Sequence, residues 1–447
     1  MFRRLFKPPL VIVVVALAFR IALILALGTY HRDVAEDHIA FGYETGRVAR
    51  SIVQGQGISS PFRGPSGPTG VLMPVYPYLL AGVFKLFGIY TTASAIAIMS
   101  LNCLFSALTC LPVSYIGERT FNRTVGNIAA WTWAFHPVAV FISVVRIWET
   151  TLTALLMSLI LLAVLHLEHV ARMRAWLGFG LLCGLMALSN PTIVAVLPFW
   201  GAWLWLRLRQ HGARPGWLIG MATLVFLLCI SPWFIRNYLV FHRLVPFRTN
   251  FGLELQIGNN PLSVGAPIYE LHPIHNPKEF EKYRQMGELA YAAEKKREAF
   301  QFIASHPGTF VRLTLLRIAY TWTYIWQLSG YTRRAQWVAA GGVFGFGLQT
   351  FLAFLGLVLA ARSGKKEAMP FGTLLIFFPI VYYVTFAQIR FRHPLEPLMV
   401  VLCVYALRRT FYGERADLPV AALAPSTSAS PAPTAFSRQN KPFRPSN

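Results

Sequence analysis

The sequence predicts an all-α protein that crosses a membrane several times. Of its 447 residues, 55% are hydrophobic and only 13% are charged. Soluble domains carry about a quarter of charged residues, so a chain this apolar indicates a polytopic membrane protein. A helix needs roughly 20 residues to cross the hydrocarbon core of a bilayer. The apolar residues of this chain are gathered in runs of about that length.

Ten apolar segments of this kind follow one another along the chain. We expect about ten transmembrane helices, at residues 10–29, 94–117, 124–143, 150–168, 174–189, 191–207, 217–235, 337–361, 370–387 and 393–408. The fifth and sixth are joined at 189–192 by a tight turn that contains proline. No small-residue cleavage site follows the first segment, so we expect an uncleaved helix there rather than a removed signal.

Basic residues between the segments set the expected orientation. Because Arg and Lys collect on the cytosolic side of membrane helices, cytosolic turns are marked by clusters around Arg3, Arg119, Arg172, Arg207 and Arg362. This orientation leaves two apolar segments, 71–88 and 310–327, that do not cross. We expect both to lie as helices at the outer interface. The alternative, that the two cross as a pair, stays open.

The same orientation divides the chain into four parts. Residues 1–236 form an N-terminal transmembrane region with a long first extracytosolic loop at 30–93. Residues 237–336 form an extracytosolic segment with polar helices and an interfacial helix, and 337–410 form the C-terminal transmembrane helices. Residues 411–447 are rich in Pro, Ser and Ala, and we expect a disordered cytosolic tail there.

The charge and cysteine patterns exclude several classes of protein. The net charge of +23 is explained by helix ends that fix topology and meet anionic lipids, and no nucleic-acid-binding motif is present. The five cysteines all lie in apolar runs, so we expect no disulfide. No His, Asp or Glu cluster has the spacing of metal ligands, and the sequence indicates no metal or other cofactor.

Two carboxylates are predicted to meet at the outer face of the membrane. Glu44 lies in the first loop, and Glu149 begins the fourth span at its outer end. A carboxylate at a helix start can serve only as a partner of the helix dipole, and one in a loop can be merely solvated. These alternatives stay open for Glu149 and Glu44 respectively.

Arginines converge on the same face. Those at the outer ends of spans or in outer turns are Arg236, Arg248, Arg390 and Arg392. Such residues often only extend their charge to the interface, but several together suit a phosphate held at head-group level. Glu396 lies just inside the last span, where an acid is functional by default, and Arg392 or His393 is its expected partner.

These parts fit transfer of a sugar from a lipid phosphate. Arginines can stabilise the charge on a departing phosphate, and one carboxylate can act as base for the acceptor. Because the sequence offers one base and no obvious nucleophile pair, we expect a single displacement that inverts the configuration at the anomeric carbon of the sugar. No GxxxxGK[ST] cradle is present, which disfavours a soluble nucleotide-sugar donor.

Four stretches, taken in order, resemble a known family. They are YETGRVARSIVQGQG at 43–57, PVYPYLLAGVFKLFG at 74–88, FHPVAVFISVVRIWETTLTALLMSLIL at 135–161 and QIRFRHPLEPLMVVLCVYAL at 388–407. Each is weak alone, but the set is similar to membrane glycosyltransferases of the GT-C superfamily, in the branch of protein O-mannosyltransferases and aminoarabinose lipid A transferases. The resemblance covers about residues 8–410.

The resemblance implies a GT-C-like bundle with interfacial helices, an extracytosolic site and a polyprenyl-phosphate sugar donor. Glu44 would be the base, supported by Glu149, and the lipid phosphate would meet Arg236, Arg390 and Arg392, with Arg248 a further candidate. The chain departs from the family where many members have an Asp-Glu pair and this one has FGYE, which makes Asp37 the second candidate for the base. The substrate pocket is expected to include Tyr43, Tyr76, His393 and Asn259.

The sequence leaves the sugar and the acceptor open. The acceptor can be a lipid, a glycan or a protein, and the protein is expected in the cytoplasmic (inner) membrane of the cell envelope. A transporter or flippase of lipid-linked glycans is the main alternative, and a non-catalytic scaffold is another. Transporters tend to show inverted repeats and polar residues at mid-membrane, and this sequence shows no visible repeat and few such residues.

Overall fold

The prediction of an all-α protein is confirmed. The computed structural model describes residues 8–32, 39–210, 212, 214–325 and 333–413. Across these residues the regular elements are helices, and the β-pairing is limited to one isolated antiparallel bridge between Ser59 and Pro68. The first-loop acid Asp37 and the tail from 414 onward lie outside the described residues.

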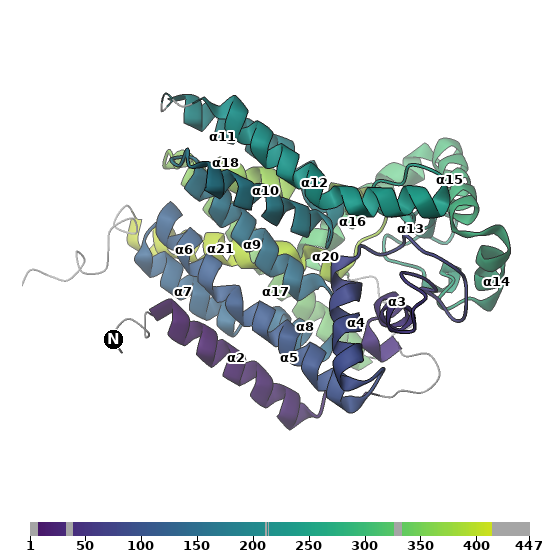
Figure 1. Ribbon diagram of the computed structural model, residues 1–447. Helices are drawn as coiled ribbons and strands as arrows, with labels where there is room; N and C mark the ends of the chain where they lie inside the picture. The colour runs from purple at the N-terminus through teal and green to yellow at the C-terminus, as the bar shows by residue number, and fades with distance from the viewer. Residues whose placement is uncertain (1–7, 33–38, 211, 213, 326–332, 414–447) are drawn as a thin grey trace, which may run out of the picture.

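Helices occupy all ten predicted spans and run side by side as a bundle (Figure 1). They are α2 (Pro8–Leu27), α5 (Thr92–Leu108) with α6 (Cys110–Thr120), α7 (Arg123–Ala134) with α8 (Pro137–Val145), α9 (Thr150–Leu167), α10 (Met173–Ala187), α11 (Leu197–Gln210), α12 (Pro215–Phe241), α17 (Arg333–Arg362), α18 (Ala368–Phe377) with α19 (Ile380–Val384), and α21 (Glu396–Tyr412).

Five of these helices are long and apolar enough to cross a bilayer, and a sixth span results if the bent pair α7–α8 counts as one. The bend of 43° falls where Pro137 begins α8, because proline lacks the N–H that would continue the preceding helix. The remaining predicted spans are the shorter helices α10, α11, α18–α19 and α21.

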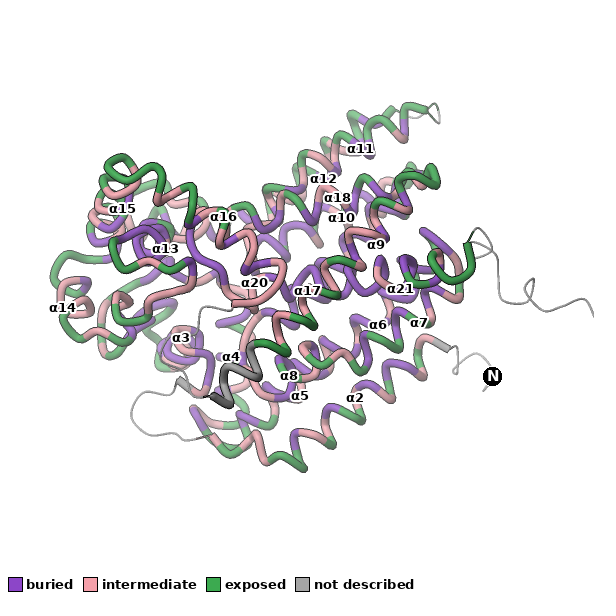
Figure 2. The backbone as a smooth tube through the Cα atoms, turned by 180° about the vertical axis from the view of Figure 1, so that it is seen from behind, coloured by how far each residue is buried: buried purple, intermediate pink, exposed green. Residues whose placement is uncertain are grey.

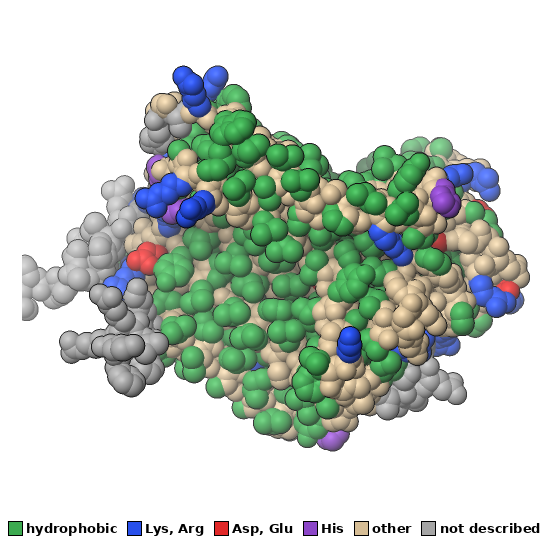
Figure 3. Space-filling view, in the orientation of Figure 1, with side chains coloured by type: hydrophobic (Ala, Val, Ile, Leu, Met, Phe, Trp, Pro, Cys, Tyr) green, Lys and Arg blue, Asp and Glu red, His purple; other side chains and the backbone are tan. Residues whose placement is uncertain are grey.

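The outer surface of the bundle is that of an integral membrane protein. Figure 3 shows a continuous apolar face over the bundle, with basic side chains gathered toward its ends. Exposed leucines of α10 and α12 contribute to this apolar surface: Leu181, Leu185, Leu224, Leu227 and Leu228. In water such a surface would be unfavourable, whereas lipid chains cover it at no cost.

The two segments expected at the interface do not meet the criteria for a span. Helix α4 (Val75–Phe87) has only 13 residues and lies across the ends of the bundle helices (Figure 1). Helix α16 (Pro307–Thr323) packs against α17 and α19. Its Arg317 is fully buried and donates to the carbonyl oxygens of Gly258 and Val384, which fixes α16 to the C-terminal ends of α13 and α19.

A small helical body lies at one end of the bundle, beyond α4 (Figures 1 and 2). It contains α3 (Glu44–Val53), α13 (Phe251–Gly258), α14 (Pro277–Met286) and α15 (Glu288–Ser305). Its own core includes Phe62, Leu253, Ile257, Tyr283 and Tyr291. The first loop and the segment after α12 therefore fold together, although they are far apart in sequence.

Short helical turns complete the described chain. They are η1 (Ile39–Phe41), η2 (Pro191–Ala195), η3 (Tyr269–Leu271), α20 (Ile389–Arg392) and η4 (His393–Leu395). The five cysteines lie in bundle helices and form no disulfide.

Candidate functional site

Two adjoining cavities lie where the bundle meets the helical body. The first has a volume of about 350 Å³ and the second about 170 Å³. Glu254 of α13 and Arg390 of α20 line both of them, so these two side chains form the wall that the cavities share.

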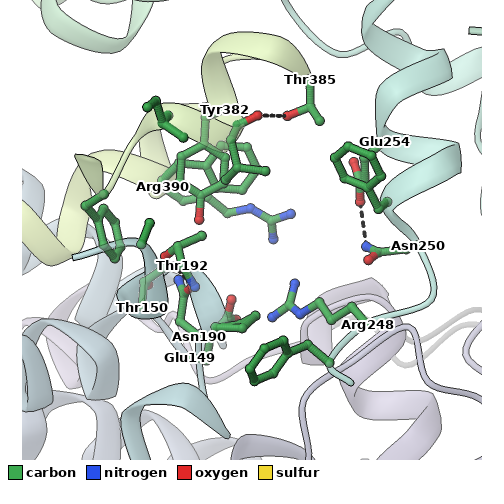
Figure 4. A pocket seen from close by; sticks show the side chains of 18 of the residues that line it. Glu149, Thr150, Asn190, Thr192, Arg248, Asn250, Glu254, Tyr382, Thr385 and Arg390 are labelled. Atoms are coloured by element: carbon green, nitrogen blue, oxygen red, sulfur yellow. Dashed lines mark hydrogen bonds between the residues drawn. The ribbon is translucent and has the colours of Figure 1, made fainter. Parts of the chain in front are cut away.

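The first cavity combines an apolar wall with two cations. Figure 4 shows the guanidinium groups of Arg248 and Arg390 facing the same open space, with Glu149 on another wall. Helices α18 and α19 contribute an apolar lining of Phe377, Phe378, Ile380, Val381 and Tyr382. An anion attached to an apolar chain suits such a lining, because the cations meet its charge while the aromatic and aliphatic groups cover its chain.

The turn at 189–192 also contributes to the first cavity. Asn190 caps η2 by accepting hydrogen bonds from the backbone N–H (3.1 Å) and the hydroxyl (2.6 Å) of Thr192, and both residues line the cavity. The sequence predicted only a turn here. The polar residues around Pro191 were visible in the sequence. However, the same residue pattern occurs in turns that only cap a helix and in turns that bind a ligand.

The second cavity contains Glu44, the first residue of α3. The turn before α3 passes close to the loop between α8 and α9, since a Cβ on Gly42 would lie 2.3 Å from the carbonyl oxygen of Ile147. Gly42 also has a φ of +90°, a conformation that glycine adopts without strain. This close approach brings Glu44 beside Trp148 in the cavity lining.

His272 faces Glu44 across the second cavity, with 3.7 Å between its Nε2 and Oε1 of the carboxylate. Burial lowers the pKa of His272 to about 4, even though the neighbouring charge of Glu44 acts in the opposite direction. The imidazole is therefore neutral at physiological pH. Its Nδ1 accepts a hydrogen bond from the backbone N–H of Ile274 (3.1 Å), so the ring proton is assigned to Nε2, on the side of Glu44.

Glu254 is a site residue that the sequence reasoning missed. Burial raises its pKa to about 7, and Glu44 adds to the rise, while Arg390 and Arg248 oppose it. Its Oε1 accepts a hydrogen bond from Nδ2 of Asn250 (2.9 Å), drawn in Figure 4. The available signal was a lone acid in the apolar stretch FGLELQIG at 251–258.

Of the residues predicted from the sequence, five lie around the two cavities: Tyr43, Glu44, Glu149, Arg248 and Arg390. Arg390 is further held by the rings of Trp148 and Phe391, whose centroids lie 5.2 and 5.4 Å from its guanidinium carbon. These cation–π contacts position the guanidinium of Arg390 and leave its positive charge in place.

The other two predicted arginines do not line either cavity. Arg236 donates to the carbonyl oxygens of Ile58 (2.8 Å) and Thr69 (2.7 Å) and so holds the first loop against α12. Arg392 is buried, and its Nε lies 2.5 Å from Oε1 of Glu396. The expected partner of Glu396 is thereby confirmed, and the same contact draws Arg392 into the bundle and away from the cavities.

Three predicted pocket residues also lie elsewhere. Tyr76 donates to Oδ1 of Asn102 (3.0 Å) inside the bundle. Asn259 donates to the carbonyl oxygens of Leu255 and Val384, and His393 is fully buried beside the ring of Trp133. Each is packed within the fold, and none of the three lines either cavity.

Over the described part of the chain, no group of three or more His, Cys, Asp or Glu side chains is arranged to hold a metal ion.

Comparison with known proteins gives one family match and several structural ones. A family model described as dolichyl-phosphate-mannose-protein mannosyltransferase matches residues 67–235, which run from just before α4 into α12. No curated protein sequence matches the chain.

Two solved structures of an oligosaccharyltransferase from Archaeoglobus fulgidus have a similar fold. One is the archaeal oligosaccharyltransferase AglB in complex with an inhibitory peptide and a dolichol-phosphate, with a TM-score of 0.52 and 17% identity over 90% of this chain and 50% of that one. The other, in the apo form, has a TM-score of 0.53 and 17% identity over 92% and 51% of the two chains. The chain thus spans about half the length of the structures it matches, and at this identity the likeness concerns the fold. Together with the family match, it confirms the predicted resemblance to the GT-C superfamily.

Proposed function

We propose that this protein is a GT-C glycosyltransferase that moves a sugar from a polyprenyl-phosphate-linked donor to an acceptor at the extracytosolic face of the cytoplasmic membrane. The observation that carries the proposal is the first cavity, where Arg248 and Arg390 face one space beside an apolar wall of α18 and α19. The proposal is supported by the family model, whose description names a dolichyl-phosphate sugar, and by the dolichol-phosphate bound to AglB.

The donor fits the first cavity by charge and by polarity. Its phosphate would lie between Arg248 and Arg390, and its isoprenoid chain would follow Phe377, Phe378 and Val381 toward the lipid. A phosphate paired with two guanidinium groups gains charge-assisted hydrogen bonds. As the bond to the sugar breaks, the same groups stabilise the additional charge on the departing phosphate.

The acceptor would enter the second cavity, beside Glu44. Its hydroxyl oxygen attacks the anomeric carbon, the hydroxyl proton passes to the Glu44 carboxylate, and the bond between the anomeric carbon and the phosphate oxygen breaks. One displacement of this kind inverts the configuration at that carbon. Glu149 lines the first cavity and would support the sugar there rather than take the proton.

The test is sugar transfer in membranes that contain the full chain. Radiolabelled polyprenyl-phosphate sugars are supplied, with mannose first because the family description names it, and the wild type is compared with Glu44→Gln at matched expression. Gln keeps the shape of the side chain and cannot accept the proton. The matched control is Glu270→Gln, an exposed acid of η3 in the same helical body.

We expect transfer by the wild type and by Glu270→Gln, and a loss on the order of a hundredfold or more in Glu44→Gln. Equal transfer by Glu44→Gln would move the base to another acid, with Asp37 and Glu149 next in order. A product with retained configuration would exclude the single displacement. If the wild type transfers none of the sugars but moves the intact donor across the membrane, the protein is a flippase.

A further inference from the structure

Glu254 occupies a position that transfer by Glu44 alone does not explain. It lies on α13, in the wall between the cavities, and lines both of them. In the first cavity it faces the space between Arg248 and Arg390, where the donor phosphate is proposed to lie (Figure 4). In the second it shares the lining with Glu44. A carboxyl group here is within the same small volume as both the leaving group and the base.

We propose that Glu254 is a second catalytic residue, the general acid that protonates the departing lipid phosphate. The inference rests on the proposed function, because it takes the donor phosphate to lie between Arg248 and Arg390. Glu44 of α3 would remove the proton of the acceptor, and Glu254 of α13 would give a proton to the departing phosphate. The fold brings these two carboxyl groups to one site.

The proton balance of the step closes within the site. The acceptor oxygen bonds to the anomeric carbon and gives its proton to Glu44. The bond from that carbon to the phosphate oxygen breaks, its electron pair stays on the oxygen, and that oxygen takes the proton of Glu254. The products are the glycosylated acceptor, the singly charged lipid phosphate, protonated Glu44 and ionised Glu254. A proton returned from Glu44 to Glu254 through their shared cavity restores the starting state.

The surroundings of Glu254 keep its proton available. A donor phosphate between the two arginines would offset their charge, which removes much of their pull against protonation of the neighbouring carboxyl. Asn250 donates a hydrogen bond to Oε1 of Glu254, and the carboxyl group lines both cavities. Two carboxyl groups with opposite tasks require environments that separate their affinities for protons.

Other charged and titratable groups around Glu254 come from every neighbouring element. Those that share a cavity lining with it are Tyr43, Arg146, Glu149, Tyr269, His272, His275 and Tyr382, besides Glu44, Arg248 and Arg390. Behind α13 lies α15, where Lys295 is paired with Glu279 (3.0 Å) and Glu298 (3.3 Å) and Lys296 lies over the ring of Phe300. The lysines of α15 are thus directed to their own partners.

The test is the pH dependence of sugar transfer, measured in membranes between pH 5 and 9. The wild type is compared with Glu254→Gln, Glu254→Asp and the control Glu270→Gln. The donor is labelled polyprenyl-phosphate mannose, or another labelled donor if the wild type uses that one. We expect the wild-type rate to fall above neutral pH, as the acid loses its proton. Glu254→Gln should be slower by about a hundredfold at pH 6 and should show no fall at alkaline pH, so that the difference from wild type narrows as pH rises. Glu254→Asp should keep the alkaline fall at a reduced rate.

The opposite results separate the two proposals. If the wild type transfers sugar and Glu254→Gln is equally active, or is slowed by one factor at every pH with the alkaline fall retained, Glu254 is not the general acid while the transferase function stands. If the wild type transfers no sugar from any donor, the proposed function itself fails, and the assignment of Glu254 fails with it. Should Glu254→Gln not fold, Glu254→Asp decides: a transfer rate equal to that of the wild type at every pH rules the assignment out.

Discussion

Glu44 and His272, from the first loop and from the segment after α12, face each other across the second cavity with 3.7 Å between Oε1 and Nε2. The imidazole is neutral, since burial lowers the pKa of His272 to about 4. The pair is therefore a neutral imidazole beside a carboxylate, and it is not a salt bridge. We predict that His272 helps to position the Glu44 carboxylate without competing for the proton that Glu44 is proposed to accept.

His272→Phe tests this orientation. Phe can keep the edge-to-face packing of this ring on Phe62, whose centroid lies 5.4 Å away, but it removes both ring nitrogens. We expect kcat for transfer to fall about tenfold with little change in KM for the donor, because positioning of a base is worth roughly this much. The shape of the pH profile between pH 5 and 8 should not change, because His272 does not titrate there. His306→Phe, at an exposed position, is the control.

Glu288 is the main polar anchor of the helical body, and its removal should destabilise the fold. Its carboxylate accepts hydrogen bonds from Thr69 Oγ1 (2.5 Å), Thr249 Oγ1 (2.5 Å), Tyr283 Oη (2.6 Å) and the backbone N–H of Gly70 (2.7 Å). We expect Glu288→Ala to lower the free energy of unfolding by about 3 kcal/mol, since it leaves several buried donors without a partner.

The measurement is thermal unfolding in detergent, read from tryptophan fluorescence. Glu281→Ala is the control, because Glu281 pairs with Arg284 on the exposed face of α14 and such pairs contribute less than about 1 kcal/mol. Equal effects of the two substitutions would show that the network around Glu288 does not hold the first loop in place.

Arg392 and Glu396 form an ion pair within the bundle, and both side chains are 1% exposed. Replacing Glu396 by Leu leaves a buried guanidinium uncompensated, and we expect a loss of about 3–5 kcal/mol. The double variant Arg392→Met/Glu396→Leu should be more stable than Glu396→Leu, since no lone charge remains. Chemical unfolding of the wild type, Arg392→Met, Glu396→Leu and the double variant measures the coupling free energy between the two side chains. The folded double variant should keep the wild-type KM for the donor, whereas a rise would return Arg392 to the phosphate site.

Glu254→Gln should stabilise the protein at alkaline pH. The pKa of Glu254 is raised in the folded protein, from an ordinary 4.5 to about 7, so the folded state binds this proton more tightly than the unfolded state. The resulting destabilisation is absent below about pH 4.5, grows as pH rises and is complete above about pH 7, where it reaches up to roughly 3 kcal/mol. Gln carries no such cost.

Unfolding temperatures of wild type and Glu254→Gln at pH 5 and pH 8 check this expectation. The variant should unfold at a higher temperature at pH 8 and at nearly the same temperature at pH 5. A loss of activity combined with this gain in stability would mark Glu254 as a residue retained for function at the expense of stability. A variant that is less stable at pH 8 would contradict the raised pKa.

The local pattern of the sequence was sufficient for the secondary structure of the described residues. Apolar runs of near-spanning length are properties of consecutive residues, so the ten helical segments and the shorter helix α4 followed from them. The same holds for Glu44 and Glu149, because a helix start next to a loop is visible in the sequence.

The choice among neighbouring arginines was made by the tertiary structure. Arg390 and Arg392 are two residues apart on the short helix α20, and such positions lie on opposite sides of a helix with 3.6 residues per turn. The sequence could not say which side faces the cavities, because that depends on where α20 docks. The structure directs Arg390 to the cavities and Arg392 to Glu396.

The sequence by itself thus determined an all-α membrane bundle with a polar helical segment after α12, because hydrophobic and charged residues respond to bilayer and water and need no particular partner. Only the tertiary structure decided that Glu254, Asn190 and Thr192 join Arg248 and Arg390 around one cavity. These residues come from segments far apart in the chain, and their meeting depends on how helices pack, which no local spacing encodes.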